Sequence, residues 1–279
     1  MTFSIVARSA DGSAFGVAVA SKFLAVGAMV PAAQAGVGAI ATQSYANLAY
    51  RPQGLALLAT GVDAAGVVAG LTAADPGRAQ RQLGVVGLTG DGASFTGAGC
   101  HPWAGGVTGD GFAIQGNILA GPQVVDRMRE AFLASDPQAP LARRLHAALL
   151  AGDRAGGDRR GRQSASVLVV AKGQGYGGTS DVVADLRVDD HPDPVAELGR
   201  LLDLHSLYFD KPDPAALLPL TGELAEEVAA RLADLGHRPG PGGLDDALAD
   251  WAGIENLEER MVPGHIDPLV LAHLRAQSG

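Results

Sequence analysis

Strand-like and helix-like segments come in blocks along this chain, and this order restricts its fold more than any other feature. Runs rich in Val, Ile and Phe predict strands, whereas apolar residues three or four positions apart predict helices. Strand blocks that alternate with helix pairs are typical of antiparallel sheets covered by helices, and not of a singly alternating parallel fold. We therefore expect an α+β fold, with strands at 3–8, 14–21, 36–43, 83–97 (a hairpin), 111–118, 164–172 and 181–188, and helices at 52–60 and 63–74 and after Pro122, Pro140 and Asp193.

The composition changes at 209–220, where Pro and Asp predict a linker. Three short helical patterns follow it. The first has Thr221 as its expected cap and Gly236 at its end, and the third opens at Asp267-Pro268. These signals predict a domain at 1–210 and a small three-helix domain at 211–279.

The first two strands form a hairpin whose register can be derived from its turn. Asp11-Gly12 is a strong turn signal between two apolar runs. With these two residues as the loop, counting outward places Thr2 opposite Ser21, with Lys22 next to them. A slip of one residue would instead place Lys22 opposite Thr2 and exchange the two faces of the strand.

Thr2 follows the initiator methionine directly, and we expect removal of Met1 in a cell. The mature chain would then begin with a hydroxyl nucleophile and an α-amine base in one residue. Nearby Lys22 would lower the pKa of this amine, and Ser21 would contact the nucleophile. The plainer alternative is that Thr2 is an ordinary second residue and that Ser21 and Lys22 simply end a strand.

Composition excludes several classes of protein. The chain has 279 residues, a formal net charge of −9 and no long basic run, which argues against nucleic acid and anionic membranes as partners. No apolar run reaches the length of about 20 residues that a membrane span needs. The single Cys100 and the lack of a signal-peptide pattern predict a cytoplasmic protein. His and Cys spacing indicates no metal site, and we expect no cofactor.

Two further groups of polar residues are candidate site residues. Arg159, Arg162, Gln163 and Ser164 lie in a Gly-rich basic loop and would hold a substrate carboxylate; the alternative is a solvated turn. Amide side chains near the ends of two apolar strands form the second group. Asn117 and Gln115 would donate to an oxyanion or, alternatively, satisfy a buried strand end. We take Asn117 as the catalytic candidate, and Gln115 and Gln43 as candidate substrate-binding residues.

Five long runs carry a resemblance to a known family: TFSIVAR, GVAVASKFLAVGAMVPAAQAGVGAIATQ, QGNILAG, GGDRRGRQSA and DLRVDDHPDP. They resemble the domain-of-unknown-function family numbered ten twenty-eight, which is placed among the N-terminal nucleophile (Ntn) hydrolases. The resemblance covers about residues 2–208 and implies a four-layer αββα sandwich. Residues 212–272 are similar to a peptidoglycan-binding module of three helices.

These observations lead to the hypothesis of an Ntn-type amidohydrolase that cleaves an amide, imide or peptide-like bond of a small molecule. Thr2 would attack, with Ser21, Lys22 and Asn117 as further catalytic residues. The rival hypothesis is a non-catalytic scaffold that binds a metabolite or mediates assembly. We also expect a homo-oligomer, and a C-terminal module that packs, assembles or binds only peptidoglycan fragments.

Overall fold

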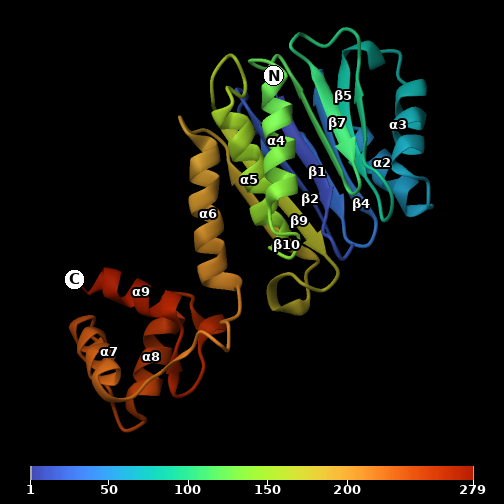
Figure 1. The fold of residues 1–279 in the computed structure, drawn as a ribbon. Coiled ribbons are helices and arrows are strands. Elements are labelled where there is room, and N and C mark those ends of the chain that lie inside the picture. Colours follow the sequence, from blue (N-terminus) through green and yellow to red (C-terminus); the bar gives the residue numbers. More distant parts are fainter. Residues whose placement is uncertain (1, 279) are drawn as a thin grey trace. The chain divides into compact units, whose positions relative to one another are not determined.

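A computed structural model describes residues 2–278 of the chain (Figure 1). It divides into two compact units, Met1–Leu202 and Asp203–Gly279. The division lies within helix α6 (Pro194–Phe209), ahead of the Pro-rich segment in which the sequence predicted a linker. The expected removal of Met1 concerns a residue outside the described part.

The first unit has an α+β fold built on two antiparallel sheets. Successive side chains of each strand point to opposite faces of its sheet. The larger sheet has the order β10-β9-β2-β1-β8-β7, which places β1 near its centre. The smaller sheet has the order β3-β4-β5-β6. The strands are β1 (Thr2–Arg8), β2 (Ala14–Ser21), β3 (Pro31–Gln34), β4 (Gly38–Ser44), β5 (Arg81–Val86), β6 (Ala93–Thr96), β7 (Gly105–Gly109), β8 (Phe112–Asn117), β9 (Ser164–Ala171) and β10 (Val182–Val188).

Apolar cores lie on both faces of each sheet. Side chains from both sheets, with those of the short helix α1 (Val26–Met29), form one core between the sheets. The outer face of the larger sheet packs against α4 (Gln123–Ala134), α5 (Leu141–Arg154) and the start of α6. The outer face of the smaller sheet packs against α2 (Tyr50–Ala59) and α3 (Ala64–Ala73), so that helices cover the sheets on both sides (Figure 1).

The predicted register of the first hairpin is confirmed. Phe3 pairs with Ala20 and Arg8 with Phe15, which is the register that counting outward from Asp11-Gly12 gives. Ser9 and Ala14 close the loop through a backbone hydrogen bond of 2.9 Å. The end of β1 therefore lies beside the end of β2, where Ser21 is.

Buried side-chain amides join the two sheets at the end where β1 begins. Gln82 of β5 is central, because its Oε1 accepts from Gln43 Nε2 and from Asn117 Nδ2, each at 2.8 Å. Gln43 Oε1 accepts from Ser4 Oγ at 2.7 Å, and Gln115 Nε2 donates to the same hydroxyl at 2.7 Å. All five side chains are almost fully buried. We call Ser4, Gln43, Gln82, Gln115 and Asn117 the inter-sheet amide network.

The second unit contains α7 (Gly222–Asp234), α8 (Gly243–Ile254), α9 (Pro268–Gln277) and the paired strands β11 (Leu218–Pro219) and β12 (His265–Ile266). Their apolar side chains share one core around Trp251. Asp267 caps α9, as the Asp-Pro pattern predicts, and pairs with buried Arg260 at 2.7 Å. Thr221 precedes α7, but its side chain makes no capping hydrogen bond.

Replacing Gln82 by leucine should destabilise the first unit strongly. The change removes the bonds of Gln82 to the Asn117 amide and the Gly116 carbonyl, and leaves Gln43 Nε2 with only its two 3.3 Å contacts to backbone carbonyls. Each unsatisfied buried group costs about 1–3 kcal/mol. We expect a loss of about 3 kcal/mol or more in the free energy of unfolding, measured by urea denaturation. Gln138→Leu, at an exposed position, is the control and should change it by less than about 0.5 kcal/mol. Equal stability of the two variants would show that the network is not a structural joint.

Candidate active site

The structure brings Thr2 and Ser21 into contact at the start of β1. Thr2 Oγ1 lies 3.2 Å from Ser21 Oγ, and both side chains are buried. Ser21 pairs with Ser164 of β9 on one side, and Thr2 pairs with Asn117 of β8 on the other. Four polar residues thus form a row across the four neighbouring strands β8, β1, β2 and β9. Since paired residues in a sheet point to the same face, the side chains of this row share the face that looks toward the smaller sheet.

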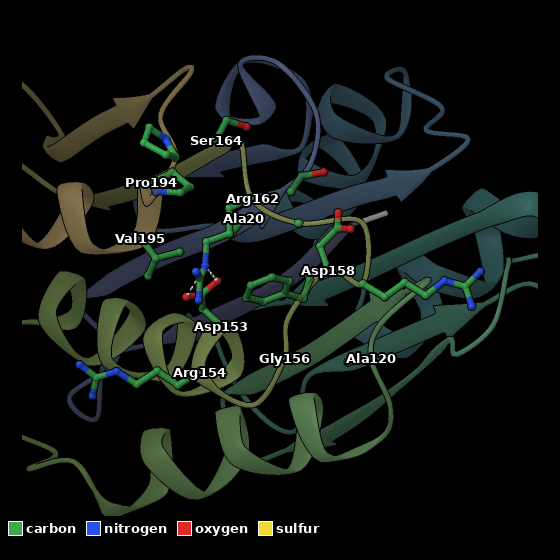
Figure 2. Close-up of a pocket in the computed structure, with 15 residues that line it drawn as sticks. Ala20, Ala120, Asp153, Arg154, Gly156, Asp158, Arg162, Ser164, Pro194 and Val195 are labelled. Atoms are coloured by element: carbon green, nitrogen blue, oxygen red, sulfur yellow. Dashed lines mark hydrogen bonds and ion pairs between the residues drawn. The ribbon is translucent and has the colours of Figure 1, made fainter.

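A cavity of about 600 Å³ opens at the same end of the larger sheet (Figure 2). Its size suits a small molecule. Ser21 and Ser164 line it from the polar row, whereas Thr2 is not among its lining residues and lies directly behind Ser21. Apolar side chains and a loop between α5 and β9 complete the wall, which consists of Phe3, Ala20, Ser21, Ala120, Asp153, Arg154, Gly156, Asp158, Arg159, Gly161, Arg162, Ser164, Pro192, Pro194 and Val195.

Asp158 joins this loop to the end of β2. Its buried carboxylate accepts a hydrogen bond of 2.8 Å from the backbone N–H of Lys22 and pairs with Arg160 at 3.2 Å. A second bond, from the backbone N–H of Arg160, fixes the turn of the loop at 2.9 Å. Sequence reasoning missed Asp158, because its partner Lys22 lies more than a hundred residues away and no local pattern indicates the contact.

Lys22 follows the last residue of β2 and its side chain is exposed. In the described part of the chain, its ammonium group makes no ion pair or hydrogen bond. The backbone of Lys22 is therefore fixed by Asp158, whereas its side chain is exposed. The structure leaves its catalytic role a prediction.

The four candidates of the basic loop have different surroundings. Arg162 lines the cavity and donates through Nε to both oxygens of Asp153, at 2.8 and 3.0 Å (Figure 2). This contact raises the pKa of the Arg162 guanidinium above its ordinary value. Arg159 also lines the cavity and is exposed. Gln163 lies outside the lining and donates to Asp190 at 3.2 Å, while the buried Ser164 hydroxyl accepts from the backbone N–H of Val26 at 3.1 Å.

The amide candidates lie in the network between the sheets. Gln43 and Gln115 have almost no exposed surface and do not line the cavity, so a substrate-binding role for them stays a prediction. Gln43 also contacts the nucleophile candidate, because its Nε2 donates to the Thr2 carbonyl at 3.3 Å. Asn117 pairs with Thr2, and Gln82, which the sequence did not single out, fixes its side chain.

This arrangement places Ser21 and two arginines on the wall of one small cavity, with Thr2 in contact with Ser21 and the Asn117 amide paired with Thr2. Within residues 2–278, no three His, Cys, Asp or Glu side chains are placed to hold a metal ion. In the same range, every helix is too short or too polar to cross a membrane.

Family profiles match two separate parts of the chain. A profile described as "Putative peptidoglycan binding domain" matches residues 208–274, so the second unit contains a peptidoglycan-binding-like domain. No curated protein matches the chain. Among solved structures, Anbu (ancestral β-subunit) from Yersinia bercovieri is 15% identical with a TM-score of 0.35, covering 76% of this chain and 98% of its own. That TM-score is too low to say anything of fold or activity.

The first unit has a clear relative of known structure. A crystal structure of protein SPO2555 from Silicibacter pomeroyi, described as a member of DUF1028, is 32% identical with a TM-score of 0.66. The match covers 81% of this chain and 92% of the other. The profile of the "Family of unknown function (DUF1028)" matches residues 2–198. The chain therefore belongs to the family DUF1028.

Proposed function

We propose that the first unit is an Ntn-type amidohydrolase acting on an amide, imide or peptide-like bond of a small molecule, with Thr2 as its nucleophile. The observation that carries this proposal is the 3.2 Å contact between the hydroxyls of Thr2 and Ser21, because Ser21 also lines the cavity. A nucleophile must lie within hydrogen-bond reach of a group that orients it, and beside the space that the substrate occupies. The family match begins at Thr2, which is the residue that the proposal requires at the mature terminus.

The reaction needs only groups that a chain beginning at Thr2 carries. Thr2 Oγ1 attacks the substrate carbonyl carbon, and the α-amine of Thr2 accepts the hydroxyl proton. Collapse of the tetrahedral intermediate breaks the C–N bond, and the departing nitrogen takes that proton. Water then attacks the resulting ester, which releases the acid and restores the Thr2 hydroxyl. Ser21 orients the nucleophile through its hydroxyl throughout.

Asn117 is the proposed oxyanion donor. Its Nδ2 carries two hydrogens, and Gln82 accepts one of them at 2.8 Å. The other hydrogen remains for the oxygen that becomes negative in the intermediate. A donor that neighbouring groups already hold in place costs little reorganisation during the reaction, which is what makes it effective. Gln82 is then a positioning residue for Asn117.

The layered arrangement supports the same assignment. Two sheets packed face to face, with helices outside each, are the layers that the resemblance to the Ntn hydrolases implies.

The second unit is proposed to bind peptidoglycan fragments, since it matches the profile of a putative peptidoglycan-binding domain. Cosedimentation of the full-length protein with purified peptidoglycan, and its release by soluble fragments, tests this part. Protein that stays in the supernatant would leave assembly or packing as the role of the unit.

Replacing Thr2 by alanine should abolish hydrolysis and keep the fold. We expect a loss of about a thousandfold or more in kcat, because the nucleophile itself is removed. The thermal midpoint should change little, since the change removes one small side chain at the start of β1. Activity is measured on a panel of amides, lactams and ureides. Thr60→Ala, which removes an exposed hydroxyl at the end of α2, is the control. Intact mass of the wild type must show a chain beginning at Thr2; a retained Met1, or near wild-type activity of Thr2→Ala, excludes the mechanism.

Replacing Lys22 by alanine should move the acid limb of the pH–rate profile to higher pH. A nearby cation disfavours protonation of the α-amine, so removing it raises the pKa of the amine. The base acts only when neutral, and activity then appears only at a higher pH, by up to about one unit. Lys172→Ala is the matched control, since Lys172 is an exposed lysine paired with Asp181. An unchanged profile would show that the Lys22 ammonium does not reach Thr2.

A further inference from the structure

Arg162 is held by only one edge of its guanidinium group. Its Nε donates to both carboxylate oxygens of Asp153, at 2.8 and 3.0 Å. Within residues 2–278, neither Nη atom of Arg162 has a hydrogen-bond partner. The guanidinium is planar and its donors form a fixed fork. The contact with Asp153 therefore fixes the plane of the group and leaves the Nη donors available. Both residues line the cavity, and Figure 2 shows the pair there.

The two partners differ in exposure, and this difference indicates what the pair is for. The Asp153 side chain is 6% exposed and that of Arg162 is 46% exposed. A buried carboxylate needs a partner, whereas an ion pair with one exposed member contributes little to stability. Asp153 lies in the last turns of α5, a rigid element, so the pair positions Arg162 more than it strengthens the fold. Asp153, with a smaller contribution from Asp193, raises the pKa of Arg162, which keeps its charge at any working pH.

The remaining charges of the cavity wall also favour an anion. Arg154 and Arg159 line it, are exposed, and make no ion pair in the described part of the chain. The carboxylate of Asp158 is already matched by Arg160. Cations in excess along a small cavity raise the local concentration of anionic ligands. The apolar wall at Phe3 and Val195 leaves room for the uncharged part of such a molecule.

We propose that Arg162, oriented by Asp153, binds a carboxylate of the substrate through its Nη groups, so that the substrate class is small amides carrying a free carboxylate, such as N-acyl amino acids. Two parallel N–H···O bonds from an arginine fork match a carboxylate in geometry as well as charge. Arg162 and Ser21 line one cavity, which lets a single small molecule span both. The substrate class rests on the proposed Thr2 function, whereas the carboxylate site itself does not.

The test uses the full-length Thr2→Ala protein, which binds ligands without consuming them. The probes are matched pairs of N-acyl amino acids and their primary amides: N-acetylglycine, N-benzoylglycine and N-acetylglutamate, each with its amide. Dissociation constants come from calorimetry or ligand-observed NMR. We expect carboxylates to bind at least about tenfold more tightly than their amides. Arg162→Lys keeps a cation for Asp153, so the fold is retained, yet it should lose about tenfold in carboxylate affinity because the fork is gone.

Two further variants complete the design. Asp153→Asn should weaken carboxylate binding, since the guanidinium is then no longer held in plane, and leave amide binding unchanged. Arg127→Lys is the matched control, because Arg127 is an exposed arginine that does not line the cavity. It pairs with Glu130, with 2.6 Å between the two groups. Equal binding of acids and amides, equal affinity in Arg162→Lys and Arg127→Lys, or no binding of any acid overturns the proposal. Wild-type hydrolysis of amides without preference for a carboxylate would overturn it too, and would leave the Thr2 mechanism intact.

Discussion

The inter-sheet amide network is the constraint on which the site depends. An ordinary interface between two sheets is apolar, and most of this one is. At the end where β1 begins, the apolar core gives way to Gln43, Gln82, Gln115 and Asn117, which bond to one another and to the backbone of the facing strands. A buried amide without partners is costly, so the two sheets are held in the register that makes these bonds. Among the described residues, Gln115 Oε1 is the member of the network that has no hydrogen-bond partner. The position of Thr2 relative to the smaller sheet follows from that register.

The loop before β9 is fixed by a different kind of interaction. Asp153 and Asp158 are both buried carboxylates, and both take their partners from the arginines of the loop. Asp158 also reaches the backbone of Lys22, which makes the end of β2 and the loop one structure. Buried negative charges therefore order a segment that is rich in Gly and would otherwise be flexible. The exposed part of Arg162 lines the cavity, and the proposed carboxylate site uses its Nη groups.

Local patterns predicted the central hairpin well, because its register depends only on the turn and on alternation along two strands. They did not predict β3, with the sequence PAAQ, or β7, with GGVTG. Both are short edge strands of small residues, and pairing with β4 and β8 rather than propensity makes them strands. The same reason explains the missed site residues. Gln82 and Asp158 matter through partners distant in the sequence, which no spacing rule contains.

Alternation along β1 determines how a substrate must approach Thr2. Successive residues point to opposite faces of a strand, so Phe3 faces the helices while Thr2 faces the smaller sheet. The cavity touches both faces at this end, through Phe3 and Ala20 on one and Ser21 and Ser164 on the other. A molecule bound near Arg162 therefore reaches the nucleophile only around the ends of β1, β2 and β9. Small hydroxyl residues occupy those ends in all three strands, and any larger side chain in the row would close this route.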